Sequence, residues 1–148
     1  MLRYFIAIIV ILLTVFGPII LAGELMVYID LNTLIMAIYL PFLYVCILFG
    51  FKNTGLAFSE PFKPEPVTEH LLMSKRFFKT LNKVVLISSA VTVFIGVILF
   101  LNVWLLESDT IISGILITIL PIFHYLAFAL IVLIPFMTII DNKLNKVK

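Results

Sequence analysis

The chain has 148 residues, of which 64% are hydrophobic and only 12% carry a charge. Its mean hydropathy is +1.28 and its formal net charge is +2. A soluble domain of this length cannot bury so much apolar surface, so the composition excludes an ordinary soluble domain. The single cysteine, Cys46, lies in an apolar stretch, where we expect a small packing residue rather than a disulfide partner.

Four apolar stretches follow one another along the chain, at residues 4–22, 33–51, 84–106 and 111–140. A helix needs roughly 20 apolar residues to cross about 30 Å of hydrocarbon, and each stretch approaches or exceeds that length. Because backbone polar groups cannot stay unpaired in lipid, the spanning segments should be helices. The sequence therefore predicts an all-α membrane protein, with residues 1–148 forming one integral membrane domain of four transmembrane helices.

The basic residues avoid two of the connections between these stretches. They lie before the first stretch, in the central loop at residues 52–83 and near the C-terminus: Arg3, Lys52, Lys63, Lys75, Arg76, Lys79, Lys83, Lys143, Lys146 and Lys148. The other connections carry the acids Glu24, Asp30, Glu107 and Asp109. Since basic loops stay inside, we predict cytoplasmic termini, a cytoplasmic central loop and two short outward turns. The net charge then indicates topology, not nucleic-acid binding.

The central loop divides into an elbow and a helix. Three prolines, Pro61, Pro64 and Pro66, predict an extended, non-helical elbow over residues 58–67. Thr68 then fills an N-cap position and Glu69 places an acid in the first turn. An amphipathic cytoplasmic helix is therefore expected from about Glu69, running without a break into the third span.

One stripe of this amphipathic helix is basic and contains Lys75, Lys79 and Lys83, and Arg76 stands next to Lys75. We favour contact between these residues and anionic headgroups at the membrane surface. A surface for docking a partner protein is the alternative.

Both halves of the chain resemble a known family. Ala22-Gly23, then Tyr28-Ile29-Asp30 and Thr33 ahead of an apolar run, resemble the opening hairpin of the flagellar stator A subunit in the MotA/TolQ/ExbB proton-channel family. The second half is similar to its third and fourth spans, at positions that include Gly96, Asn102, Gly114, Ala129 and Pro135. The resemblance implies a multi-pass protein of the bacterial inner membrane. It also implies a homo-oligomeric ring, a pentamer, around the single helix of a stator B-type partner with a periplasmic domain.

The chain departs from that family in two ways. Leu120-Pro121 stands where members commonly carry small or threonine-rich residues, and the central loop is too short to form the torque-generating region of flagellar members. A short, flagellar-stator-like A subunit without the large cytoplasmic region is therefore expected. The resemblance implies that the titrating Asp belongs to the partner subunit and not to this chain. The lack of a carboxylate in the third and fourth spans fits this expectation.

Several polar side chains fall inside the third and fourth spans and are candidates for an ion path: Ser88, Ser89, Thr92, Thr118 and His124. A buried His can relay protons near neutral pH. The alternatives are a neutral His124 bonded to a neighbouring helix, and threonines bonded to the carbonyls four residues earlier. Glu24 and Asp30 either mark the outer membrane boundary or line the outer mouth of a channel.

Four prolines fall in or beside the spans, at Pro18, Pro41, Pro121 and Pro135, and each is predicted to bend its helix. Pro121 stands three residues before His124, where a static kink or a moving hinge is possible.

The sequence shows no catalytic set, phosphate-binding loop or metal-ligand cluster, so we expect neither an enzyme nor a metal or other cofactor. Two functional hypotheses stay open. The first is a compact A-type subunit of an ion-driven, motor-like complex, with the proton as the expected ion. The second is a non-conducting membrane scaffold that keeps the ring fold and binds a partner.

Overall fold

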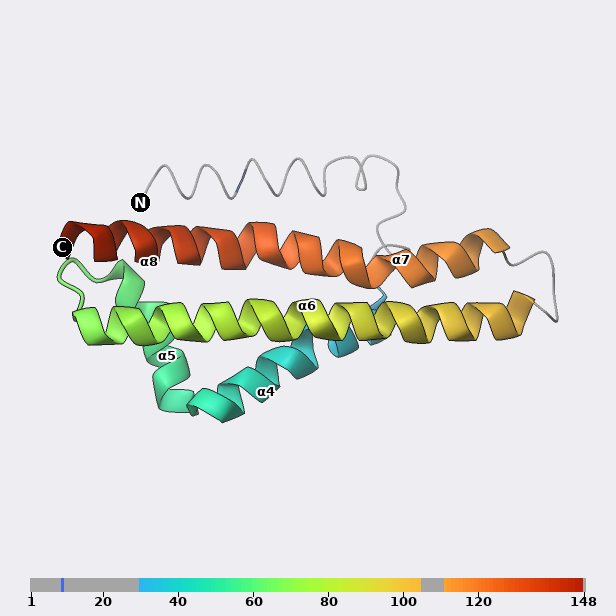
Figure 1. The fold of residues 1–148 in the computed structure, drawn as a ribbon, viewed down its shortest axis with the longest axis horizontal. Helices are drawn as coiled ribbons and strands as arrows, with labels where there is room; N and C mark the ends of the chain where they lie inside the picture. The colour runs from blue at the N-terminus through green and yellow to red at the C-terminus, as the bar shows by residue number, and fades with distance from the viewer. Residues whose placement is uncertain (1–8, 10–29, 105–110, 148) are drawn as a thin grey trace.

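The computed structural model describes residues 9, 30–104 and 111–147, and these are almost entirely helical. Figure 1 shows the arrangement of the elements. In chain order the elements are α3 (Leu31–Leu34), the π-helix η1 (Ile35–Tyr39), α4 (Leu40–Phe49), α5 (Phe51–Ser59), the 3-10 helix η2 (Glu60–Phe62), α6 (Thr68–Trp104), α7 (Ile111–Phe128), the π-helix η4 (Ala129–Leu133) and α8 (Ile134–Val147).

The long helix α6 lies alongside α7, η4 and α8, which together form a second rod running in the opposite direction (Figure 1). Gly96 allows the close approach of α6 and α7. A Cβ atom added there would stand 3.3 Å from the Cα atom of Thr118. Small residues at such crossings let membrane helices approach until their backbones touch.

The segment α3–η1–α4 begins about halfway along α6 and runs toward the end of α6 that starts at Thr68 (Figure 1). Gly50 then reverses the chain with a φ of 80°, a conformation that side chains disfavour. Helix α5 returns to α6, and the space between them is filled mainly by aromatic rings. Phe58 lies at the centre of this cluster, with ring contacts to Phe77, Phe78 and Phe136 at centroid distances of 5.1 to 5.7 Å.

Each π-helix ends two residues before a proline. η1 ends at Tyr39, two residues before Pro41, and η4 ends at Leu133, two residues before Pro135. A proline ring collides with the carbonyl four residues earlier, and in both cases that carbonyl lies inside the π-helix. The wider π turn therefore gives the ring room. Pro121 instead lies inside the α-helix α7.

The described residues contain three segments long and apolar enough to cross a membrane: Leu31–Phe49, Thr68–Leu101 and Thr118–Lys146. They correspond to the second, third and fourth predicted spans. The all-helical prediction is confirmed for this part of the chain, and so is the helix that starts at Thr68 and continues into the third span. The first predicted span, residues 4–22, lies outside the described residues. The side of the membrane on which the termini lie stays a prediction.

The prediction of an extended elbow over residues 58–67 was wrong for its first half. Helix α5 continues to Ser59 and η2 adds another turn, so only residues 63–67 are non-helical. Pro61 is the second residue of η2, where its missing N–H breaks no helical hydrogen bond. Packing of Phe58 against the aromatic cluster stabilises the helix that brings it there.

Candidate functional site

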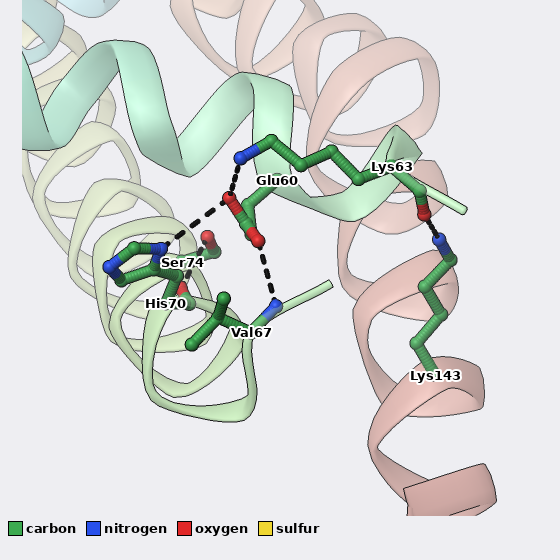
Figure 2. Close-up of polar contacts among 6 residues, drawn as sticks. All are labelled: Glu60, Lys63, Val67, His70, Ser74 and Lys143. Atoms are coloured by element: carbon green, nitrogen blue, oxygen red, sulfur yellow. Dashed lines mark hydrogen bonds and ion pairs between the residues drawn. The ribbon is translucent and has the colours of Figure 1, made fainter. Parts of the chain in front are cut away.

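A buried carboxylate organises the elbow between η2 and α6. The side chain of Glu60 is fully buried. Its Oε2 atom lies 2.6 Å from the Nζ atom of Lys63, and its Oε1 atom accepts a 2.8 Å hydrogen bond from the backbone N–H of Val67. The Nδ1 atom of His70, on the first turn of α6, lies 3.5 Å from Oε2 (Figure 2). Lys63, Val67 and His70 therefore all approach the carboxylate of Glu60.

The position of Glu60 follows from the local sequence. Lys63 stands three residues after Glu60 on the same turn, and Val67 immediately precedes α6. The positive end of the α6 dipole also favours an anion here. The hydrogen bond from Lys63 lowers the pKa of Glu60 below its ordinary value; burial opposes this effect, and the bond from Val67 adds to it. Glu60 therefore stays ionised at neutral pH although it is buried.

Two further contacts tie this end of the molecule together. The Nζ atom of Lys143, on α8, donates a hydrogen bond to the carbonyl of Lys63 (Figure 2). Lys75 on α6 pairs with Asp141 on α8 at 2.7 Å. Basic residues of the central loop and of the C-terminal segment thus lie at one end of the described bundle. The loop and the C-terminal segment had been predicted to share one side of the membrane.

A second polar group lies about halfway along the bundle. Asp30 caps α3 and accepts hydrogen bonds from the N–H of Asn32 at 3.3 Å and of Thr33 at 3.1 Å, and also from the Thr33 hydroxyl. His124, on α7, is buried with 6% of its surface exposed, and its imidazole lies within electrostatic range of the Asp30 carboxylate. The sequence had placed Asp30 at the outer boundary and His124 near mid-span. In the structure the helix that Asp30 caps, α3, packs against α7, which carries His124.

Two of the four hydroxyl groups predicted to line an ion path, those of Ser88 and Thr92, donate to backbone carbonyls. Ser88 donates to the carbonyl of Met36 at 2.8 Å and so joins α6 to η1. Thr92 donates to the carbonyl of Ser88 at 2.9 Å, the self-bonded arrangement that was the alternative. Thr118 packs at Gly96. The Oγ atom of Ser89 is buried and has no hydrogen-bond partner among the described residues.

The remaining predicted residues have different surroundings. Lys75 is engaged by Asp141, whereas Arg76 and Lys79 are exposed on α6. Glu24 lies outside the described residues. In the described part of the chain, no group of three His, Cys, Asp or Glu side chains could hold a metal ion.

Sequence reasoning missed the Glu60 cluster and one contact between helices. Tyr125 on α7 donates a 3.0 Å hydrogen bond to the Oδ1 atom of Asn82 on α6. Glu60 had a weak signal: it is an acid between Phe58 and Phe62, with a lysine three residues later. Nothing in the sequence indicates that Asn82 and Tyr125 would meet.

These features define the chain as a helical membrane protein with a charged cluster at one end and a polar pair midway along the bundle. Compared with protein-family models, with curated proteins and with solved structures, the chain matches none of them.

Proposed function

We propose that this chain is a compact A-type subunit of an ion-driven complex in the bacterial inner membrane, with the proton as the transported ion. In this proposal several copies, five by resemblance to the MotA/TolQ/ExbB family, surround the single helix of a stator B-type partner. The three apolar segments support a membrane location, and the family resemblance of the sequence supports the ring.

The observation that carries the proposal is the position of His124, a buried histidine on α7, which packs against the helix α3 that Asp30 caps. An ionisable residue within membrane-spanning segments is costly and generally serves transport, proton relay or binding. His124 is buried on α7 within range of a carboxylate from the start of another span. An imidazole is a group that can accept and release a proton near physiological pH, and a nearby ionised carboxylate can act as its counter-charge. The pair would pass protons between the partner's carboxylate and water.

The scaffold hypothesis has its own supporting observation. Ser88 and Thr92 donate to backbone carbonyls, and the Thr33 hydroxyl donates to Asp30. Side chains engaged in this way stabilise helix contacts and are not free to bind a passing ion. A protein that only binds its partner would show the same arrangement.

Proton uptake into liposomes tests the proposal, with the complex isolated from its native membrane. His124→Leu and Asp30→Asn should each reduce uptake by roughly tenfold or more, within the usual contribution of a positioned proton-transfer group, while the mass of the complex stays unchanged. Tyr125→Phe is the matched control, because it removes a polar atom on α7 next to His124 that is bonded to Asn82 instead. Unchanged uptake in both test variants would favour the scaffold, and so would no uptake by the unmodified complex.

A further inference from the structure

An open groove runs between the η1–α4 segment and α6. It has a volume of about 440 Å³. Met36, Leu40 and Tyr44 line one side, and Ile87, Val91 and Ile95 line the other. All six side chains are more than a third exposed, from 39% at Ile95 to 57% at Tyr44. Because both walls belong to segments able to cross a membrane, the groove opens toward lipid or toward another membrane helix.

The polar groups in this groove cannot hold a polar ligand. Ser88 and Thr92 also line it, but their hydroxyls donate to the carbonyls of Met36 and Ser88. The rest of the lining is aliphatic or aromatic, apart from the phenol group of Tyr44. A flexible hydrocarbon chain matches this surface. A tightly docked helix does not, because such sites require small residues where the backbones meet, and here Leu40, Tyr44 and Ile87 line the walls.

Toward the start of α6, the apolar stripe of groove residues is followed by basic residues. Residues four apart are neighbours on a helix face, so Lys83 follows Ile87 by one turn toward the start of α6, and Arg76 lies two further turns along. Both side chains are exposed. Among the described residues no acid pairs with either of them, in contrast to Lys75, which pairs with Asp141. Unpaired cations beside an apolar groove complement a negatively charged headgroup.

We propose that the groove binds one acyl chain of an anionic phospholipid, whose phosphate is held by Lys83 and Arg76. The chain lies along Ile87, Val91 and Ile95, and the glycerol region lies near Tyr44, on the part of α4 closer to Lys83. The site depends on charge at one end and on apolar shape along its length. It does not depend on whether the complex conducts protons.

Native mass spectrometry of the purified full-length protein tests this site, with phosphatidylglycerol and phosphatidylcholine of identical acyl chains as probes. The unmodified protein should retain phosphatidylglycerol preferentially. The double variant R76Q/K83Q should weaken that binding by roughly thirtyfold, because each cation near an anionic lipid surface contributes about fivefold. Lys52→Gln combined with Lys146→Gln removes the same number of charges from exposed positions on α5 and α8, away from the stripe, and should retain the preference.

The apolar part of the site needs a separate variant. Val91→Trp fills the groove and should reduce retention of both lipids, whereas Leu86→Trp, at an exposed position outside the groove lining, should not. Circular dichroism confirms that each variant remains helical. Equal retention of the two lipids by the unmodified protein would overturn the proposal, and so would unaltered retention in both R76Q/K83Q and Val91→Trp. Cross-linking of Val91→Cys to a second copy, or to residues 4–22 of the same chain, in place of lipid retention would also overturn it.

Discussion

The Glu60 cluster and the Asp30–His124 pair show two ways in which ionisable groups are accommodated among apolar helices. Glu60 is fully buried, and a lysine, a backbone N–H and an imidazole surround it within 3.5 Å. Asp30 accepts hydrogen bonds within its own helix start, from Asn32 and Thr33, and that helix packs against α7, which carries His124. The first arrangement holds a charge in place, whereas we propose that the second serves proton transfer. We therefore expect the cluster to contribute mainly to stability and the pair mainly to function.

The largest effect should come from Glu60→Gln. The change removes the charge that accepts the bonds from Lys63 and Val67, and a hydrogen bond to a charged group contributes about 1.5–3 kcal/mol. Glu65→Gln is the matched control, since it makes the same chemical change five residues along the same elbow at an exposed side chain. The free energy of unfolding in mixed micelles, measured by circular dichroism, should fall for the first variant and stay nearly constant for the second. Equal free energies of unfolding for the two variants would show that the Glu60 cluster does not stabilise the fold.

Lowering the pH should reduce the free energy of unfolding in the same way as Glu60→Gln. The pKa of Glu60 is lowered in the folded protein from an ordinary value of 4.5, so the unfolded chain binds the proton more tightly. The contribution of Glu60 to stability is therefore complete above about pH 4.5 and is lost as pH falls through the lower folded pKa. Unfolding measured from pH 7 to pH 3 should show this decline in the unmodified protein, on top of the contributions of other carboxylates. A decline of the same size in the Glu60→Gln variant would contradict the assignment.

A smaller change is expected beside the second region. Tyr125→Phe removes the hydrogen bond to Asn82 and leaves the ring in place. Hydrogen bonds between membrane helices average about 0.6 kcal/mol, so the free energy of unfolding should fall by roughly that amount. Asn82→Ala combined with Tyr125→Phe in a double-mutant cycle measures the coupling directly. A coupling near zero would mean that the two helices gain nothing from this contact.

The smallest effect is expected for Lys75→Gln, at the same end of the molecule as Glu60. The pair of Lys75 with Asp141 is as short as the Glu60 pair, at 2.7 Å, but its side chains are 43% and 46% exposed. Exposed ion pairs contribute about 0.2–1 kcal/mol and are screened by salt. The loss measured by micelle unfolding should be near the lower limit and should vanish in 1 M salt. A loss as large as that of Glu60→Gln would show that position, and not burial, determines the strength of these contacts.

The polar residues of the spans were readily identified from the sequence, but their partners were not. Thr92 bonds to the carbonyl of Ser88 because a hydroxyl in a helix can reach the turn before it, a local property that sequence alone suggests. Ser88 bonds to Met36 and Asp30 approaches His124, and these contacts join segments far apart in the chain. No periodicity in a single sequence encodes such a pairing.

The sequence by itself determined that the described segments are helical and apolar enough to cross a membrane, and it placed the start of α6 within one residue of Thr68. Hydropathy, proline and capping act over one or two turns, so they can be read locally. Only the tertiary structure decided that Gly50 would reverse the chain, that Phe58 would extend α5 into the aromatic cluster, and that Glu60 would be buried. A carboxylate exposed in a loop and one enclosed by a fold look the same in sequence, because burial depends on what distant segments bring to it.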